Sequence, residues 1–526
     1  MSIRLDGVTL TLTGSEKSLR RRIAARLAVP VGRVVSYKIL RKSLDARDKQ
    51  KIRWVYTLQL EASDEAALLR QWRDDPQVRP LLEAHQSPAG APLTRAQRPV
   101  IVGAGPAGLF AADILARRGL PPLVLERGRP VAERHADVGA LLAQGVLDPE
   151  SNICFGEGGA GTYSDGKLTT RLNDPLVRHV NETFVELGAP GSILYDAAPH
   201  LGSDKLPGYI QAFRERLQER GVEFRFGARV ADIVIEDGRL QGLLLAGGEQ
   251  VQTDLALLAI GHSAADLARA LHARGVAVAA KAFAVGARIE HPQAFVDRAQ
   301  YGRVAGHPKL PPATYRLTHQ GPERRGVYSF CMCPGGMILP SATDAAHLTV
   351  NGGSEAGRAG RLANAALVAA VGPADFGADP LAGLAFREAI EAAAARLGGG
   401  PCVAPAQRAS DFLRNAASRS LPESSYRPGL TPADLRAALP DFIAAALAHA
   451  LHAWGKRLPG FAGEQALLVG VETRTSCPWR LVRDERFQAA GVAGLYVAGE
   501  GAGYAGGIVS SAIDGVKAAL SIEDDN

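Results

Sequence analysis

One glycine-rich stretch has the residue types and spacing of a site for a nucleotide. Gly103, Gly105 and Gly108 separate a short apolar run from a helical pattern, and a second apolar run ends at Glu126. In such a unit the first glycine permits a tight turn, and the second lets the backbone approach a pyrophosphate at the helix N-terminus. The third glycine allows close packing of helix on strand, and the acid accepts hydrogen bonds from ribose hydroxyls. The stretch therefore predicts dinucleotide binding.

The same glycine pattern occurs at residues 156–161 and 501–506, but neither copy lies in a strand–helix–strand unit with a following acid. The last copy follows an apolar run that ends at Gly499 and Glu500, and an amphipathic helical pattern follows it at residues 508–520. An acid at a strand end can hold ribityl hydroxyls, and helix N-terminal amides can stabilise negative charge on a reduced flavin. This second element favours FAD over NAD.

Four longer stretches resemble a largely uncharacterised family of FAD-dependent dehydrogenases from bacteria and plastids, within the glutathione-reductase type of flavoprotein. They are residues 152–168, 330–336, 470–475 and 499–507. The resemblance covers nearly the whole chain and implies a Rossmann-type FAD-binding fold. Because it does not name a substrate, the electron donor or acceptor and the oligomeric state stay open, as does the use of NAD(P)H as a transient reductant.

By this resemblance, the first glycine unit holds the ADP half of FAD, and the chain near Glu500 faces the ribityl chain and the pyrimidine edge. Related flavoproteins often have Asp where this chain has Glu500, which reaches one methylene further. The implied cofactor-binding residues are Gly103, Gly105, Pro106, Ala107, Gly108, Glu126, Arg127, Arg134, Gly158, Gly159, Ala160, Gly161, Thr162, Ser164, Gly261, Gly499, Glu500, Gly506, Gly507, Ile508 and Val509. Of these, Arg127 or Arg134 is expected to reach the phosphates or the adenine side.

The same stretches supply the candidate catalytic residues Asp165, Lys167, Glu472 and Arg474. Carboxylates and cations beside a flavin could anchor an acidic substrate and move a proton while flavin N5 moves a hydride. For Asp165 and Lys167 the competing interpretation is solvation or local capping in the loop. For Glu472 and Arg474 it is an exposed cross-strand ion pair. His262 ends an apolar run, where a structural hydrogen bond is a commoner role than catalysis.

The cysteine pattern narrows the class of flavoenzyme. Cys331 and Cys333 would face the same side of a strand, and we interpret them as buried small residues, with a redox or metal pair as the alternative. Disulfide reductases place a C-x4-C pair soon after the first unit, where this chain has only Cys154. The Asp-Gly pair typical of flavin hydroxylases is also missing at residues 260–263. Hydride transfer to or from an organic molecule is thus favoured over oxygen insertion, and no metal site is expected.

The order of patterns predicts an α/β fold: a Rossmann-type FAD-binding fold with an inserted α+β substrate domain and a small N-terminal α+β domain. The expected domains are residues 1–90, then 91–280 and 465–526 for FAD, and 281–464 for the substrate. A Pro-, Gly- and Ala-rich linker is expected at residues 87–98. Within the substrate domain, Ala-rich patterns predict helices at residues 358–371, 384–397 and 442–454.

The N-terminal module is basic, with 19 Lys and Arg against 10 Asp and Glu in residues 1–98. Residues 41–51, expected between two strands, are rich in cations. They form either a solvated hairpin loop or a patch for an anionic partner such as RNA. The alternative to a pure oxidoreductase is therefore a flavoprotein that binds or acts on RNA or another anionic partner.

Composition sets the remaining limits. The chain has 526 residues, 46% hydrophobic and 22% charged, which excludes wholesale disorder. Five cysteines are too few for a disulfide framework in a chain of this length. Neither a signal-peptide pattern nor a long uncharged apolar run is found, so a cytoplasmic protein that does not span a membrane is expected.

Overall fold

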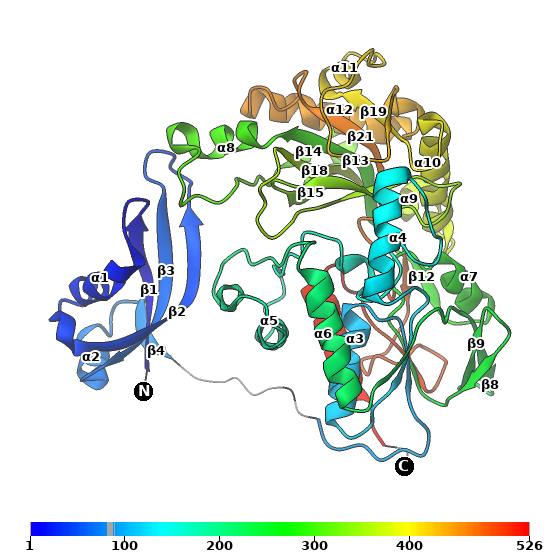
Figure 1. Ribbon diagram of the computed structural model, residues 1–526, viewed down its shortest axis with the longest axis horizontal. Coiled ribbons are helices and arrows are strands. Elements are labelled where there is room, and N and C mark those ends of the chain that lie inside the picture. Colours follow the sequence, from blue (N-terminus) through cyan, green and yellow to red (C-terminus); the bar gives the residue numbers. More distant parts are fainter. Residues whose placement is uncertain (1, 82–87, 89, 525–526) are drawn as a thin grey trace.

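A computed structural model describes residues 2–81, 88 and 90–524, and it has a mixed α/β architecture with parallel and antiparallel sheets (Figure 1). Two residues of the predicted linker, Ser87 and Ala89, lie outside the described part, as do the other residues at the end of the N-terminal module. Among the described residues, no helix is both long and apolar enough to cross a bilayer.

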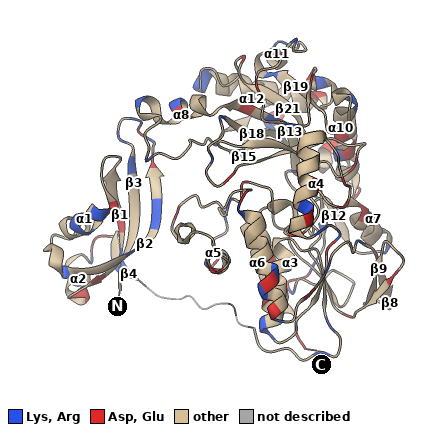
Figure 2. Ribbon diagram, viewed as in Figure 1, with Lys and Arg blue, Asp and Glu red and all other residues tan. Residues whose placement is uncertain are grey.

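The N-terminal module is an antiparallel sheet of order β2-β3-β1-β4 with two helices packed on it. Its elements are β1 (Ser2–Thr11), α1 (Leu19–Arg26), β2 (Val34–Asp45), β3 (Arg53–Ala62), α2 (Glu65–Gln71) and β4 (Val78–Leu81). The cationic stretch at residues 41–51 is only partly a loop, because β2 continues to Asp45 and pairs there with Arg53. Lys and Arg residues lie on α1 and along the sheet (Figure 2).

A parallel sheet of order β23-β11-β5-β6-β7 carries the first glycine unit. Its strands are β5 (Val100–Val102), β6 (Leu123–Leu125), β7 (Glu223–Arg225), β11 (Ala256–Leu258) and β23 (Leu495–Val497). The helices α3 (Pro106–Arg117), α5 (Leu176–Glu186), α6 (Leu206–Glu219) and α13 (Ile508–Ser521) share one hydrophobic core with it. The other face packs on α7 (Ala265–Ala273) and on the antiparallel strands β8 (Val230–Glu236) and β9 (Arg239–Leu245), which β10 (Gln250–Gln252) extends.

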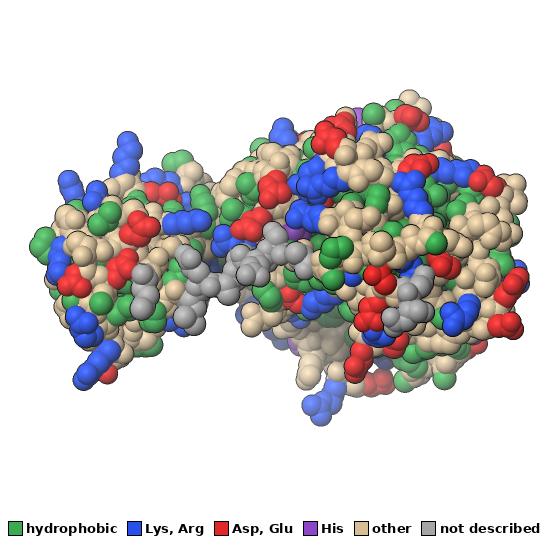
Figure 3. All heavy atoms as spheres, turned by 90° about the horizontal axis from the view of Figure 1, so that it is seen from below, with side chains coloured by type: hydrophobic (Ala, Val, Ile, Leu, Met, Phe, Trp, Pro, Cys, Tyr) green, Lys and Arg blue, Asp and Glu red, His purple; other side chains and the backbone are tan. Residues whose placement is uncertain are grey.

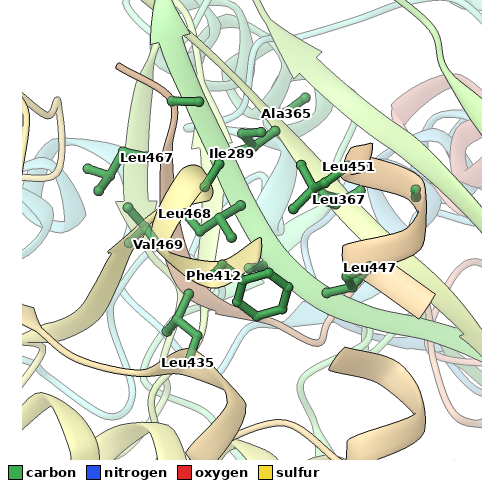
Figure 4. Packing of buried hydrophobic residues seen from close by; sticks show 14 of the residues in the cluster. Ile289, Ala365, Leu367, Phe412, Leu435, Leu447, Leu451, Leu467, Leu468 and Val469 are labelled. Carbon is green, nitrogen blue, oxygen red and sulfur yellow. The ribbon is translucent and has the colours of Figure 1, made fainter. Parts of the chain in front are cut away.

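A seven-stranded sheet of order β14-β15-β18-β13-β21-β19-β20 lies above the parallel sheet in Figure 1. Its strands are β13 (Phe283–Pro292), β14 (Thr318–Gln320), β15 (Gly326–Cys333), β18 (Leu362–Val371), β19 (Ala404–Arg408), β20 (Leu430–Pro432) and β21 (Leu467–Glu472). Helices α8 (Gln293–Tyr301), α10 (Ala382–Gly398), α11 (Ala409–Leu413) and α12 (Asp441–Arg457) accompany it, with α4 (Val131–Gln144) nearby. Figure 4 shows Leu447 and Leu451 of α12 and Phe412 of α11 packed around Ile289 and Leu468 of the sheet.

Smaller elements complete the body: α9 (Pro373–Phe376), β12 (Val278–Ala280), β16 (Met337–Pro340), β17 (Val350–Gly353) and β22 (Trp479–Leu481). The helices predicted at residues 384–397 and 442–454 are present as α10 and α12. The helix predicted at residues 358–371 is wrong, because residues 362–371 form β18 between β13 and β15. All the alanines of β18 except Ala370 are fully buried, since this strand has neighbours on both edges and layers on both faces.

The N-terminal module contacts the body through β2 and through apolar residues. Figure 3 shows the module beside the body. The Lys42 amide donates to the Tyr195 carbonyl at 2.7 Å, and the Ala197 amide donates to the Lys42 carbonyl at 2.9 Å. Leu12 and Ile52 belong to the same hydrophobic cluster as the core of the seven-stranded sheet. The module is thus packed against the body and not merely tethered to it.

Candidate functional site

One cavity, with an empty volume of about 1560 Å³ that includes its open mouth, lies between the parallel sheet and the seven-stranded sheet. Its wall includes all four candidate catalytic residues, as well as His262, Cys154 and Cys331. The predicted cofactor-binding residues on the wall are Gly103, Gly105, Pro106, Ala107, Glu126, Arg127, Gly159, Ala160, Gly161, Ser164, Gly261, Gly499, Glu500, Gly506, Gly507 and Ile508. The fold therefore brings segments that are about four hundred residues apart to one place.

The glycines of the first unit serve two different purposes. A Cβ on Gly108 would lie 1.9 Å from the Gly103 carbonyl oxygen, so this glycine is required by packing of α3 on β5. A Cβ on Gly105 would come no closer than 3.9 Å to another atom, the Cα of Gly159. Since nothing in the chain excludes a side chain at Gly105, its backbone at the start of α3 is open to the cavity, as a bound phosphate requires.

Glu126 lies at the end of β6, as the sequence predicts, and it is buried. Its carboxylate accepts hydrogen bonds from the amides of Ala104 at 2.9 Å, Gly128 at 2.9 Å and Gly156 at 3.0 Å. The acid thus fixes the glycine turn and the loop that begins at residue 156. It also lines the cavity, so its remaining acceptor capacity is available to a ligand there.

The two arginines proposed for the phosphates or adenine have different positions. Arg127 lines the cavity, stacks on the Phe155 ring at 3.8 Å and pairs with Glu150 and Asp266. Arg134 is fully buried behind the wall. It donates to four backbone carbonyls, those of Asn152, Ile153, Glu157 and Gly159.

Arg134 therefore holds the loop of residues 152–161 in place, which differs from the ligand contact we predicted. Gly108, Gly158, Thr162 and Val509 also lie behind the wall. Thr162, for example, donates its hydroxyl to the Glu157 carbonyl.

Glu500 faces the cavity from the loop between β23 and α13. Its carboxyl has no hydrogen-bond partner among the residues that the structure describes. Burial raises the pKa of Glu500 to about 8, against a weaker opposing effect of Lys281. Glu500 is half-buried, and an acceptor that faces the cavity without a partner among the described residues fits a ligand that offers hydroxyl groups, such as a ribityl chain. The adjoining N-terminus of α13 begins after Gly507, whose φ of 123° a side chain rarely adopts.

Asp165 and Lys167 form an ion pair of 2.9 Å that belongs to a larger charged cluster. Arg358 contacts the same carboxylate at 2.7 Å. Burial opposes ionisation of Asp165, but the charges of Lys167 and Arg358 lower its pKa. Lys167 also donates to the Met332 carbonyl. The ammonium is therefore held in one orientation at the cavity wall, which is more than local loop capping would require.

Glu472 ends β21 and is almost completely buried, with Arg288 of β13 as its partner. Nη1 of Arg288 lies 2.8 Å from each carboxylate oxygen. Burial raises the pKa of Glu472 to about 7, although Arg288 opposes this. Sequence reasoning missed Arg288, because nothing in the run around it distinguishes it from a surface cation.

Arg474 is buried as well, so the exposed cross-strand pair that we considered is not what the structure has. Nη2 of Arg474 lies 2.9 Å from Glu391 of α10, and Nη1 lies 3.1 Å from the Ser263 hydroxyl. Ser263 in turn contacts Nδ1 of His262 at 2.8 Å. Burial and the nearby Arg474 lower the pKa of His262 to about 3, so this imidazole is neutral and hydrogen-bonded.

The thiols of Cys331 and Cys333 lie beside Lys167, with Nζ–Sγ distances of 3.8 Å and 3.9 Å. Cys333 is buried, as we predicted for both, whereas Cys331 is half-buried and lines the cavity. No group of three or more His, Cys, Asp and Glu residues suited to a metal ion is found in the described ranges.

Comparison with known proteins gives the family. An uncharacterized protein of Clostridium beijerinckii is 41% identical over 99% of this chain and 98% of its own length. Residues 282–475 match the family model described as "FAD-dependent protein, C-terminal domain-like". The chain belongs to this family of FAD-dependent proteins.

The other matches cover less of this chain or are less similar to it. Residues 3–61 match a domain of unknown function. The digeranylgeranylglycerophospholipid reductase of Haloferax volcanii is 28% identical over 33% of this chain and 37% of its own length. Among solved structures, the flavin-dependent brominase Bmp2 is 14% identical, with a TM-score of 0.35 over 81% of this chain and 79% of that chain. FAD dependence is the property named in the description of the family model that residues 282–475 match.

Proposed function

We propose that this protein is an FAD-dependent oxidoreductase that transfers a hydride between flavin N5 and a small organic substrate. The observation that carries the proposal is that one cavity is lined by the Gly105 turn and Glu500 and also by Lys167 and Glu472. Bound FAD would supply the hydride acceptor or donor, which no side chain of the chain can replace.

The residues that would hold FAD follow from the wall. The amides at the start of α3, beside Gly105, would bind the pyrophosphate, and Glu126 would accept from the ribose of the ADP half. Glu500 would accept from ribityl hydroxyls, which gives its unpartnered carboxyl a donor. The amides at Gly507 and Ile508 would face the edge of the isoalloxazine where negative charge develops on reduction.

Other residues of the wall offer groups for the substrate. The Lys167 ammonium, fixed by Asp165, would attract an anionic group. Glu472, with a pKa raised by burial to about 7, can hold or release a proton on its carboxyl near neutral pH. The proton is needed because hydride transfer changes the charge of the substrate, and the ammonium would orient a substrate that has an anionic group.

The test is the visible spectrum of the purified full chain, before and after incubation with FAD. We expect a flavin spectrum, and heat-released flavin that co-elutes with FAD. A colourless protein that takes up no added FAD would overturn the proposal. Anaerobic photoreduction, followed by reoxidation with a panel of organic acceptors or by NAD⁺ and NADP⁺, then identifies the substrate class.

A second candidate function rests on the charge of the N-terminal module. Arg21, Arg22 and Lys38 are exposed and have no carboxylate within 4 Å in the described part of the chain. We propose that they bind an anionic partner such as RNA. Replacing all three by Gln should weaken RNA retention at low salt and reduce its salt dependence. Unchanged retention would refute this role.

A further inference from the structure

Cys331 and Cys333 form a sulfur pair that the hydride chemistry proposed above does not use. Cys331 lies at a register shift between β15 and β18, and its φ of 44° is in the left-handed region, which non-glycine residues seldom adopt. One sulfur faces the cavity and the other lies behind it. Residues two apart span at most about 7 Å between Cα atoms, close to the roughly 4.4–6.8 Å that disulfides accept.

The surroundings of this pair favour a thiolate. Lys167 lies within 3.9 Å of both sulfurs, and Nη2 of Arg288 lies 3.4 Å from Sγ of Cys333. Asp165 and Glu472 also face the pair, but each is ion-paired to one of these cations. A hydrogen bond from Cys333, followed by the charges of Lys167 and Arg288, holds the pKa of Cys331 well below its usual range, although burial opposes this.

We propose that Cys331 and Cys333 are a dithiol–disulfide redox pair that exchanges with small disulfide substrates through Cys331. The inference deepens the proposed function, because the pair lies in the cavity assigned to FAD. In the exchange, the Cys331 thiolate attacks one sulfur of the substrate disulfide, and the first substrate thiolate leaves. Cys333 gives its proton to the first substrate thiolate and attacks Cys331, which forms the intramolecular disulfide and releases the second substrate thiolate. Two protein thiols are oxidised, and one disulfide is reduced to two thiols.

Alkylation with iodoacetamide tests the reactivity of the thiol without any need for FAD. Cys154 is the matched control, because it lines the same cavity and, within the described part of the chain, its sulfur forms a hydrogen bond with the Ser341 carbonyl alone. We expect Cys331 to be alkylated at least about 10-fold faster than Cys154 at pH 7, as an activated thiolate should be. Lys167→Met should remove most of this difference at pH 7 and less of it above about pH 9, where ordinary thiols also ionise. Equal rates in the native protein would overturn the proposal.

Glutathione disulfide tests the exchange itself, with the intact mass of the reduced full chain as the readout. The native protein should become lighter by two hydrogen atoms, and peptide mapping should place the new disulfide at Cys331 and Cys333. Cys333→Ser should stop at a mixed disulfide on Cys331, and Cys331→Ser should give neither product. A stable mixed disulfide in the native protein, or a disulfide elsewhere, would overturn the proposal. Failed exchange in a protein with a flavin spectrum refutes only this inference, whereas exchange without FAD uptake refutes only the proposed function.

Discussion

Arg288 of β13 and Glu472 of β21 are buried partners, and one guanidinium nitrogen lies 2.8 Å from both carboxylate oxygens. Arg288 also donates to the Asn364 side chain and to the Cys331 carbonyl. The pair therefore joins the centre of the seven-stranded sheet to the cavity wall. Because both side chains are almost completely buried, each charge depends on the other for most of its stabilisation.

Removal of Arg288 should destabilise the protein in a pH-dependent way. Arg288→Met leaves the Glu472 carboxylate buried without a cation, and a loss of about 3–5 kcal/mol in the free energy of unfolding is expected at pH 8. The loss of unfolding free energy should be smaller at pH 5.5, because Glu472 is then protonated and a neutral carboxyl needs no cation beside it. Urea unfolding at both pH values measures it. Arg361→Met is the control: its pair with Glu423 is exposed, so a change within about 0.5 kcal/mol is expected.

Glu500 should make the FAD-free protein less stable as the pH rises. Burial raises the pKa of this acid in the folded state to about 8, above its usual value of 4.5. The folded state then binds more protons than the unfolded state between these values, so stability falls with increasing pH across this window. Thermal unfolding from pH 5 to 9 should show this slope in the native chain and a shallower one in Glu500→Gln. Glu236→Gln, at an exposed position, should keep the original slope.

Two glycine substitutions should separate ligand binding from folding. In Gly105→Ala the new Cβ meets only an ordinary contact of 3.9 Å with the Gly159 Cα, so the unfolding free energy should change by less than about 1 kcal/mol. FAD affinity should fall at least about 10-fold if the pyrophosphate approaches this backbone closely. Gly108→Ala would instead force a Cβ against the Gly103 carbonyl and should cost about 1–3 kcal/mol or more. Titration calorimetry and urea unfolding distinguish the cases, and unchanged FAD affinity in Gly105→Ala would contradict the assignment.

Substitutions of Arg127 and Arg134 should affect different properties, FAD affinity for Arg127 and stability for Arg134. Arg134→Met removes the donor of four backbone carbonyls, so the free energy of unfolding should fall by about 3 kcal/mol or more even without FAD. Arg127→Gln changes a cavity side chain with partly exposed ion pairs, so its main effect should be on FAD affinity. Denaturant midpoints and FAD titrations of both variants measure the contrast. A stable Arg134→Met protein with weak FAD binding would show that Arg134 contacts the ligand.

The fold could be predicted from sequence where local pattern and tertiary position agree. The β5–α3–β6 unit is confirmed because its glycines, helix and strands lie within one short stretch. The failure at β18 has a physical cause: its alanines have high helix propensity, but a strand buried on both faces between β13 and β15 needs small side chains. Propensity alone does not distinguish these two uses of alanine.

The candidate site could be predicted in its residues but not in their partners. Lys167 and Glu472 were found from the motifs in which they lie, and both line the cavity. Their neighbours Arg288 and Arg358 come from runs without a recognisable motif, so only the folded chain reveals them. For Arg134 the nearby motif suggested a contact with the nucleotide, whereas the structure shows it bound to backbone carbonyls. A cation near a nucleotide motif can have either role, and the sequence does not distinguish them.

The contact between the N-terminal module and the body limits how the module can be studied. Lys42 is bonded to the segment at Tyr195–Ala197, and the Leu168 amide next to Lys167 donates to Pro199 of the same segment. A truncated chain that lacks the module would lose the hydrogen bonds to Tyr195 and Ala197. The neighbouring Pro199 would then hold Leu168 less firmly, and with it the Lys167 ammonium in the cavity wall. Point substitutions on the exposed side of the module would leave these hydrogen bonds intact. They are therefore the appropriate way to test the role of the module separately from that of the body.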